Sequence, residues 1–399
     1  MRKFIGCCAW GCVLCSSPVW ADPDQGDTLD FVVGAGLMHD DNLFRSPEGR
    51  ESPDTIRNET LGLKLDKQYS LQRFKVDATV TDYSYRNNSY LNYTGKNLNA
   101  SWAWSLTPAL YGNMVASRVD SLNNFVDFVA PTAAQRRNIR TTETDRFDAE
   151  WEAFGPLHLI GSGTRYKQRN SQSFIQDDSY RARVGEAGVK YVTAAQNSIS
   201  LVRRWTAGNY ARSADPVTAM ESGFTQTDNE VRVLWQPTVK TAVTGRLARI
   251  ERRSDEFAVR DYDGYVGSTD VNWSITDKLA LLASVRHDLN PFQNIQSGTT
   301  SFSSFYASDM YTLSPTWNLS EKTRFSLRYS IERRDYRGTM VNGVPLRNDR
   351  LKYAGATVEW KPRKSVNVNL SYLRQTRDSN QTDLNFMANT ALLSALFYF

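Results

Sequence analysis

Two short clusters in the sequence combine a histidine with acidic residues. They are His39-Asp40-Asp41, near the start of the chain, and His287-Asp288, much further along. A histidine beside a carboxylate can activate water when both are held close to a substrate. Solvated polar residues at the edge of a loop give the same pattern. The clusters therefore support only a minor hypothesis, that of a surface hydrolase using His39 or His287.

No other catalytic or cofactor-binding pattern is present in the sequence. It contains no glycine-rich phosphate loop, no His/Asp metal spacing and no Gly-x-Ser-x-Gly elbow. The four cysteines, Cys7, Cys8, Cys12 and Cys15, all lie close to the N-terminus. The rest of the chain has no thiol for disulfides, metal sites or nucleophilic catalysis. We therefore predict a protein that is not an enzyme and has no catalytic residues, no cofactor and no metal.

Arginines are the more informative polar residues, because eight of them lie within segments that alternate like strands. They are Arg165, Arg181, Arg183, Arg203, Arg246, Arg324, Arg328 and Arg374. If these strands cross a membrane as a barrel, an arginine facing lipid costs a few kcal/mol at the midplane, so we expect all eight to line the lumen. Guanidinium groups there could bind hydrated anionic chains. Interleaved acidic residues such as Glu186 and Glu230 leave a second interpretation open, simple Arg–carboxylate pairing across the lumen.

The elements that position these arginines are predicted from a period of two. Residues 323–332 place Phe325, Leu327, Tyr329 and Ile331 on one face and polar residues on the other. Alternation of this kind predicts a β-strand with one apolar face. No stretch of 18 apolar residues follows the N-terminal segment, which argues against helical membrane spans.

A strand, a tight turn, a second strand and a longer polar loop recur eight times along the chain. The tight turns are predicted near Asp66-Lys67, Thr107-Pro108, Gly155-Pro156, Ala195-Gln196, Gln236-Pro237, Thr276-Asp277, Ser320-Glu321 and Lys361-Pro362. Aromatic residues lie just before six of these turns, as at a membrane interface, namely Trp102 and Trp104, Trp151 and Phe154, Trp235, Trp273, Trp317 and Trp360. Eight hairpins with one further strand at about 28–37 and another at about 384–399 predict 18 strands. The alternative is a barrel of 16 strands, the next lower even number.

The predicted fold is all-β, a transmembrane antiparallel up-and-down β-barrel in the bacterial outer membrane, in contact with its lipid. A soluble β-solenoid, propeller or pair of sandwiches also repeats short strands, but an open sheet of this length would expose its edges. Barrel closure satisfies every backbone group inside the membrane. The last segment alternates apolar residues up to Phe399. This ending resembles the signal read by the barrel assembly machinery, which we expect as a partner.

The N-terminus carries Arg2 and Lys3, then an apolar stretch too short to span a bilayer, then Ala21. This pattern predicts a signal peptide at residues 1–21 and a single barrel domain at 22–399. The formal net charge is +5, and two of these charges belong to the signal peptide. Such a small excess is not the footprint of a nucleic-acid-binding protein, so no nucleic acid is expected as a partner.

The segment Asp40-Asp41-Asn42-Leu43-Phe44-Arg45, followed by Asp54-Thr55-Ile56-Arg57 and a long strand at 74–85, resembles the EpsL-like outer-membrane proteins of exopolysaccharide operons. These are β-barrels associated with exosortase systems. The resemblance implies a pore or secretion component for exopolysaccharide biosynthesis and export, with the polymer and periplasmic export components as partners. It supplies no catalytic residues. The alternative is a general or nutrient-uptake porin, which shares the fold but takes up small solutes.

Overall fold

The structure is a computed structural model of the 399-residue chain. It describes residues 28–122, 125–126, 137–172, 179–211, 221–291, 305–337 and 346–399. The predicted signal peptide, residues 1–21, lies outside the described residues. Its removal therefore stays a prediction.

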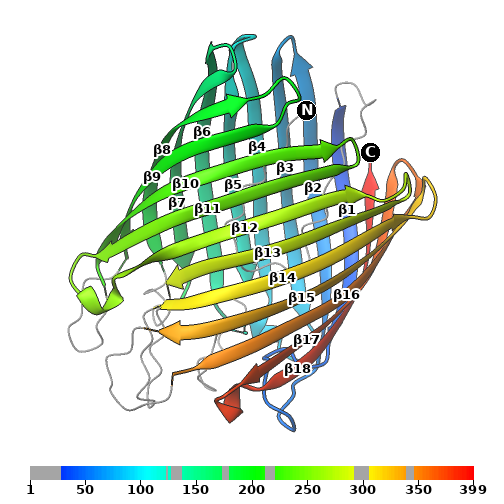
Figure 1. Cartoon of the computed structure of the whole chain (residues 1–399). Helices are drawn as coiled ribbons and strands as arrows, with labels where there is room; N and C mark the ends of the chain where they lie inside the picture. Colours follow the sequence, from blue (N-terminus) through cyan, green and yellow to red (C-terminus); the bar gives the residue numbers. More distant parts are fainter. Residues whose placement is uncertain are drawn as a thin grey trace.

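Eighteen strands form the whole wall of the molecule (Figure 1). They are β1 (Thr28–Asp40), β2 (Asp54–Tyr69), β3 (Gln72–Tyr85), β4 (Tyr93–Thr107), β5 (Leu110–Leu122), β6 (Ile139–Phe154), β7 (Leu157–Asn170), β8 (Tyr180–Val192), β9 (Ser198–Tyr210), β10 (Gly223–Thr238), β11 (Thr241–Ser254), β12 (Tyr262–Ser274), β13 (Leu279–Pro291), β14 (Phe305–Asn318), β15 (Thr323–Arg337), β16 (Asn348–Arg363), β17 (Val366–Ser379) and β18 (Phe386–Tyr398).

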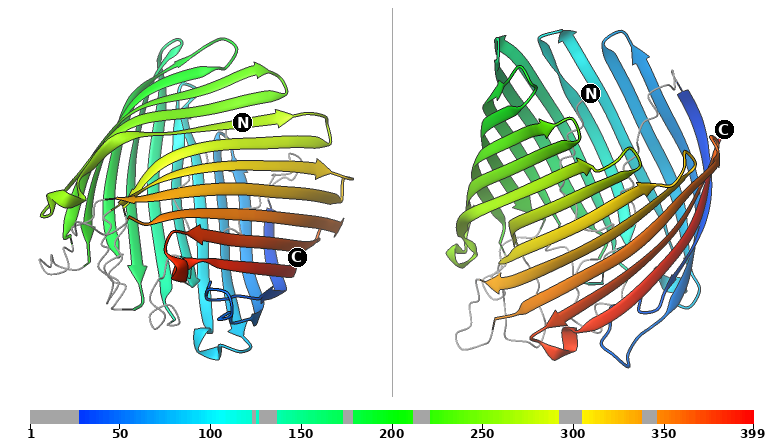
Figure 2. Two further views of the ribbon diagram at one scale, coloured as in Figure 1. Left: turned by 60° about the horizontal axis from the view of Figure 1, so that its bottom comes forward. Right: turned by 45° about the vertical axis from the view of Figure 1, so that its right-hand side comes forward.

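Every strand pairs antiparallel with the next one along the chain, and β1 pairs with both β2 and β18. The first and last strands therefore close the sheet into a barrel. At the closing seam the backbones of Phe31 and Phe399 exchange two N–H···O hydrogen bonds, of 3.0 and 2.9 Å. Because β1 takes part in the wall, the prediction of 18 strands is confirmed, and the 16-strand alternative is wrong. The strands are steeply inclined around the barrel (Figure 2).

Alternation along each strand gives the wall an apolar face and a polar face. On β1, Leu29, Phe31 and Leu37 are exposed, whereas Val32 and Asp40, on the opposite face, are buried. The apolar face is the outer one, because lipid accepts these side chains and the polar face can line water. Half-exposed tryptophans lie on this outer face beside the tight turns. They are Trp102, Trp151, Trp235, Trp273, Trp317 and Trp360.

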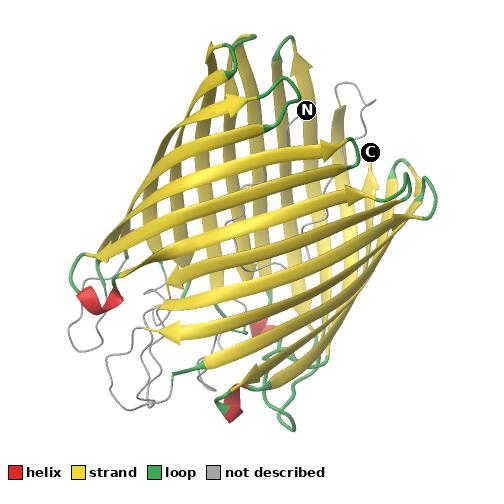
Figure 3. Cartoon of the chain, in the orientation of Figure 1, coloured by secondary structure: helices red, strands yellow, loops and turns green. Residues whose placement is uncertain are grey.

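The tight turns lie at one end of the barrel, with the C-terminus, and the strand ends that lead into the longer connections lie at the other end (Figure 1). In outer-membrane barrels the short turns are periplasmic and the long loops extracellular. In the part of the chain that the structure describes, three short 3₁₀ helices, Ser89–Leu91, Ala258–Arg260 and Thr382–Leu384, lie at the loop end (Figure 3). Among the described residues, no helix is long and apolar enough to cross a membrane.

Five of the eight predicted turns coincide with observed connections, and three are displaced by a few residues. The turns predicted near Gln236-Pro237 and Lys361-Pro362 lie slightly further along, at 239–240 and 364–365, because each proline lies in a register shift just before the turn. A bulge tolerates proline, which has no N–H to donate to the ladder. The turn predicted near Asp66-Lys67 is also displaced, because the β2–β3 ladder continues to Tyr69, and Ser70, with φ of 54°, makes the turn.

Candidate functional site

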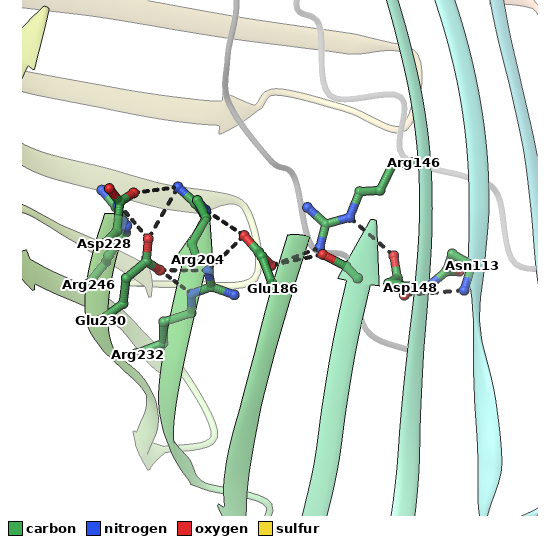
Figure 4. A network of polar contacts seen from close by, with 10 residues as sticks. Asn113, Arg146, Asp148, Glu186, Arg204, Asp228, Glu230, Arg232 and Arg246 are labelled. Carbon is green, nitrogen blue, oxygen red and sulfur yellow. Dashed lines mark hydrogen bonds and ion pairs between the residues drawn. The ribbon is translucent and has the colours of Figure 1, made fainter. Parts of the chain in front are cut away.

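A band of charged side chains crosses the polar, inward face of β6 and β8–β11, and we call it the lumen charge band (Figure 4). It has four cations and four carboxylates. Its members are Arg146, Asp148, Glu186, Arg204, Asp228, Glu230, Arg232 and Arg246. Alternation places them there, because the residues between them in sequence, such as Val231 and Leu247, belong to the apolar face.

Glu230 and Glu186 hold the arginines of the band in position. Glu230 accepts hydrogen bonds from Arg232 Nε and from Arg246 Nη2, both at 2.7 Å, and its Oε1 lies 3.2 Å from Arg204 Nη1. Glu186 accepts from Arg204 Nε at 2.7 Å and from Arg232 Nη2 at 3.2 Å. Each carboxylate therefore bridges arginines from different strands, which keeps the guanidinium groups in fixed positions.

The two signs of charge in the band differ in exposure. The side chain of Glu230 is 0% exposed and that of Asp228 is 2% exposed, whereas Arg204, Arg232 and Arg246 are each 27% exposed. Glu186, Asp228 and Glu230 lie against the wall with the guanidinium groups above them, whereas the fourth carboxylate, Asp148, is 28% exposed. A solute in the lumen therefore meets mainly cationic groups, although the band as a whole is balanced in charge.

The eight arginines singled out from the sequence divide between the two faces of the wall. Arg246, Arg324 and Arg328 lie on the inward face, where Arg246 pairs with Glu230 and Arg324 lies 3.4 Å from Glu359. The other five are on the outer face, where the expectation of lumen lining does not hold. They are Arg165, Arg181, Arg183, Arg203 and Arg374.

For three of these five arginines the reason is their height along the wall. Arg165, Arg181 and Arg183 lie toward the extracellular ends of β7 and β8, beyond the apolar part of the outer face. The cost of an outward arginine falls to about 0–1 kcal/mol near the interface. Arg203 lies next to outward Trp205, and its guanidinium is 5.7 Å from the ring centre. Height does not account for Arg203, which pairs with Ala187 midway along β8.

Sequence reasoning missed Arg204 and Arg232, the two arginines that contact Glu186 most closely. The alternation of inward and outward residues along a strand could have identified them. Trp205 and Val233 belong to the apolar face, so the residue directly before each must face the lumen.

The histidine clusters do not form an acid–base site around the neighbours seen in the sequence. His39 faces outward, 3.1 Å from Thr55 Oγ1, whereas Asp40 faces inward. His287 lies 2.6 Å from Asp309, a contact on the outer face between β13 and β14. Within the described ranges no group of three or more His, Cys, Asp or Glu residues could hold a metal ion.

The Asp40–Arg45 segment forms hydrogen bonds to β18 at the extracellular end of the seam between β1 and β18. Asn42 Nδ2 donates to the carbonyl oxygen of Met387 at 2.9 Å, and Asp41 accepts from Asn389 Nδ2 at 2.7 Å. These contacts join residues more than 340 positions apart in the sequence. The motif that carries the family resemblance therefore has a structural role in this barrel.

The same segment also anchors the connection between β5 and β6. Phe125 of this connection packs edge-on against Phe44, with ring centroids 5.0 Å apart. The next residue, Val126, is buried with Leu351 and Phe386, and its carbonyl oxygen accepts from Arg377. These two residues of the connection thus reach from the β5–β6 side to the inner face of β16–β18.

A closed antiparallel barrel of 18 strands with an apolar outer belt and a polar lumen defines a transmembrane β-barrel of the outer-membrane class. Comparisons with known proteins agree. Residues 248–397 match the family model described as "Putative beta-barrel porin 2". The protein is accordingly placed in the bacterial outer membrane. No curated protein sequence matches the chain.

Several solved structures share the fold. OccK2 (OpdF) of Pseudomonas aeruginosa is similar with a TM-score of 0.52 and 9% identity, over 94% of this chain and 100% of that one. The same protein solved in complex with glucuronate gives 0.51 and 10%, over the same shares. OccK3 (OpdO) of that organism gives 0.50 and 12%, over 93% of this chain and 96% of that one. At these identities the likeness concerns the fold alone, and it does not confirm an exopolysaccharide association.

Proposed function

We propose that the protein is a non-enzymatic solute channel of the outer membrane, a nutrient-uptake porin that favours small solutes bearing a carboxylate. The lumen charge band carries this proposal. It presents the guanidinium groups of Arg204, Arg232 and Arg246 from three neighbouring strands, with their acidic partners behind them. Guanidinium groups form charge-assisted, often bidentate hydrogen bonds with carboxylates.

The contacts of these arginines leave donors for a solute. A guanidinium has five N–H donors in a fixed geometry. Arg246, for example, uses Nη2 toward Glu230, and no described residue accepts a hydrogen bond from its Nε or Nη1. A carboxylate that passes along the lumen can therefore bind and leave without displacing the internal pairs. Transient binding at several neighbouring groups is what a selective channel requires.

Two further observations support uptake of a small solute over export of a polymer. OccK2, which has a similar fold, has been solved in complex with glucuronate, itself a carboxylate-bearing sugar. In this chain Phe125 and Val126 are buried at the inner face of the wall. A polymer would have to pass these anchored residues, whereas a small solute needs less space. Export of an exopolysaccharide is therefore the less favoured candidate.

The test uses the full chain, purified as a folded barrel and inserted in planar lipid bilayers. We expect ion conductance, and in liposome-swelling assays we expect faster entry of glucuronate than of glucose. Arg246→Gln should reduce this preference. Arg249→Gln is the matched control, since Arg249 lies three residues away on the outer face of β11. A folded barrel that passes neither current nor sugars would overturn the proposal, and loss of surface polysaccharide in a deletion strain would then favour export.

A further inference from the structure

The outer face of β7 and β8 carries an excess of positive charge at its extracellular end. From the periplasmic turn outward, β7 presents Leu157, Leu159, Gly161, Gly163, Arg165, Lys167 and Arg169, and β8 presents Tyr191, Val189, Ala187, Gly185, Arg183 and Arg181. Both strands change from apolar to small to cationic residues at matching heights. We call Arg165, Lys167, Arg169, Arg181 and Arg183 the outer cationic patch.

Like charges lie directly opposite each other in this patch. Arg165 pairs in register with Arg183, and Lys167 pairs with Arg181. Like charges at opposed positions of neighbouring strands repel each other and destabilise the sheet. Two such pairs side by side are unfavourable unless an anion lies between them.

The acidic residues near the patch neutralise only one side of it. On β6, Asp145 lies 2.9 Å from Arg165, and Glu143 lies 2.8 Å from Arg169 and 3.5 Å from Lys167. Five cations thus face two carboxylates, which leaves an excess of three positive charges.

Arg181 and Arg183 supply the part of the patch that is left without partners. Both are exposed, and neither forms an ion pair with any residue that the structure describes. Their free guanidinium groups are therefore available to an external anion.

The position of the patch on the wall identifies the kind of anion. Leu159 and Val189 on the same two strands face the hydrocarbon, so the patch lies at the outer boundary of the membrane, where lipid headgroups begin. Clusters of arginine and lysine at that level bind phosphate-bearing headgroups. A free anion in solution would gain nothing from the apolar surface directly below.

The shape of the wall below the patch agrees with a lipid. Gly163 and Gly185 lie opposite each other on the outer face, and a side chain added to either would have no atom within 4 Å. Larger residues stand on the flanking strands at the same height, namely Phe147 opposite Gly163 on β6 and Trp205 opposite Gly185 on β9. An acyl chain can lie in the shallow strip between them while its headgroup reaches the cations above.

We infer that the outer cationic patch binds the phosphate groups of an outer-leaflet glycolipid, with Arg181 and Arg183 as the main ligands. The headgroup phosphate lies between the opposed pairs Arg165–Arg183 and Lys167–Arg181 and removes their repulsion. Bound lipid therefore stabilises this part of the wall. The lumen takes no part in this interaction, so lipid binding does not depend on which solute the channel carries.

The experiment uses the full-length folded barrel in detergent, with added phosphorylated lipid A, the same lipid after removal of its phosphates, or inorganic phosphate. Native mass spectrometry gives the bound fraction at each concentration. We expect the phosphorylated lipid to bind at least about tenfold more tightly than the dephosphorylated one, which corresponds to about 1.4 kcal/mol. Inorganic phosphate should not compete at concentrations similar to those of the lipid.

Arg181→Gln/Arg183→Gln should remove most of this preference, and Arg249→Gln/Arg253→Gln is the matched control on the outer face of β11. A shift in gel mobility on heating shows that each variant is folded. If Arg181→Gln/Arg183→Gln does not fold, Arg181→Gln alone provides the comparison. Equal binding of the two lipids, or unchanged binding in a folded variant, would overturn the inference. Competition by inorganic phosphate at lipid-like concentrations would identify an ion site and overturn it as well.

Discussion

Arg45 binds the carboxylate of Asp40 through two parallel hydrogen bonds, with Nη1–Oδ1 and Nη2–Oδ2 distances of 2.8 and 2.9 Å. Asp40 ends β1, and it also accepts a hydrogen bond of 3.0 Å from Thr390 on β18. Arg45 in turn donates to Gln375 on β17 at 3.1 Å. The pair therefore joins three strands at the extracellular end of the seam, where the first and last parts of the chain meet.

Arg45→Ala should destabilise the barrel by about 3–5 kcal/mol, because it leaves the buried charge of Asp40 without its partner. The expected result is a lower midpoint of urea unfolding in detergent, measured by tryptophan fluorescence. Arg50→Ala is the control, since Arg50 in the same loop lies 3.7 Å from Asp383 and both side chains are largely exposed. Such a pair contributes about 0–1 kcal/mol. Equal effects of the two substitutions would contradict a special role for Arg45.

The barrel could be predicted from the sequence because its determinants are local. Alternation in segments such as 323–332 fixes which residues form strands, and aromatic residues before most of the tight turns mark the membrane boundary. The exact turns were harder to predict. Pro237 and Pro362 suggested turns, but a β-bulge accommodates each of them within the strand instead.

The lumen could be predicted only in part, because the face of an arginine depends on the parity of its strand and on its height in the membrane. Arg203 and Arg204 are neighbours in sequence and point to opposite sides of the wall. The pairing of Arg204 with Glu186 and Glu230 depends on the register of three strands, which no single segment specifies. The contact of Val126 with Arg377 spans 251 positions and has no local signal.

Glu230→Gln should make the channel more selective for anions. The substitution removes one of the four carboxylates of the lumen charge band, so the band gains one net positive charge. A unit charge about 10 Å from a permeating ion contributes about 0.4 kcal/mol in a water-like medium, so anion entry should rise about twofold and cation entry should fall similarly. The reversal potential in a potassium chloride gradient measures this change.

Glu251→Gln is the control for this experiment, because Glu251 pairs with Arg253 on the outer face of the same hairpin. It removes the same charge without changing the lumen. A reversal potential that shifts equally in both variants would show that the lumen charge band does not set the selectivity.

Gly112→Ala should destabilise the wall because three groups approach one another closely there. A Cβ atom at Gly112 would lie 1.9 Å from the carbonyl oxygen of Asp148 and 2.7 Å from the indole of Trp104. The indole of Trp104 on β4 stacks on the ring of Phe147 on β6, across the strand β5 that carries Gly112, with ring centroids 5.5 Å apart. Forcing an atom into packed surroundings costs about 1–3 kcal/mol. Gly163→Ala, at an open position of the outer wall, should change the free energy of unfolding measured in urea by no more than about 0.5 kcal/mol.

Phe399→Ala should impair assembly in cells without impairing the folded barrel. The backbone of Phe399 exchanges two hydrogen bonds with Phe31, and alanine keeps both of them. The ring itself is 73% exposed at the periplasmic end, so its loss removes little internal packing. We therefore expect normal refolding in detergent but a reduced amount of folded protein in the outer membrane, because the ring is what the barrel assembly machinery would contact. Phe31→Ala, which removes another exposed ring from the adjacent strand, should leave both measurements unchanged. Equal loss in cells for the two variants would show that assembly reads the apolar end of the barrel in general and that Phe399 has no special role.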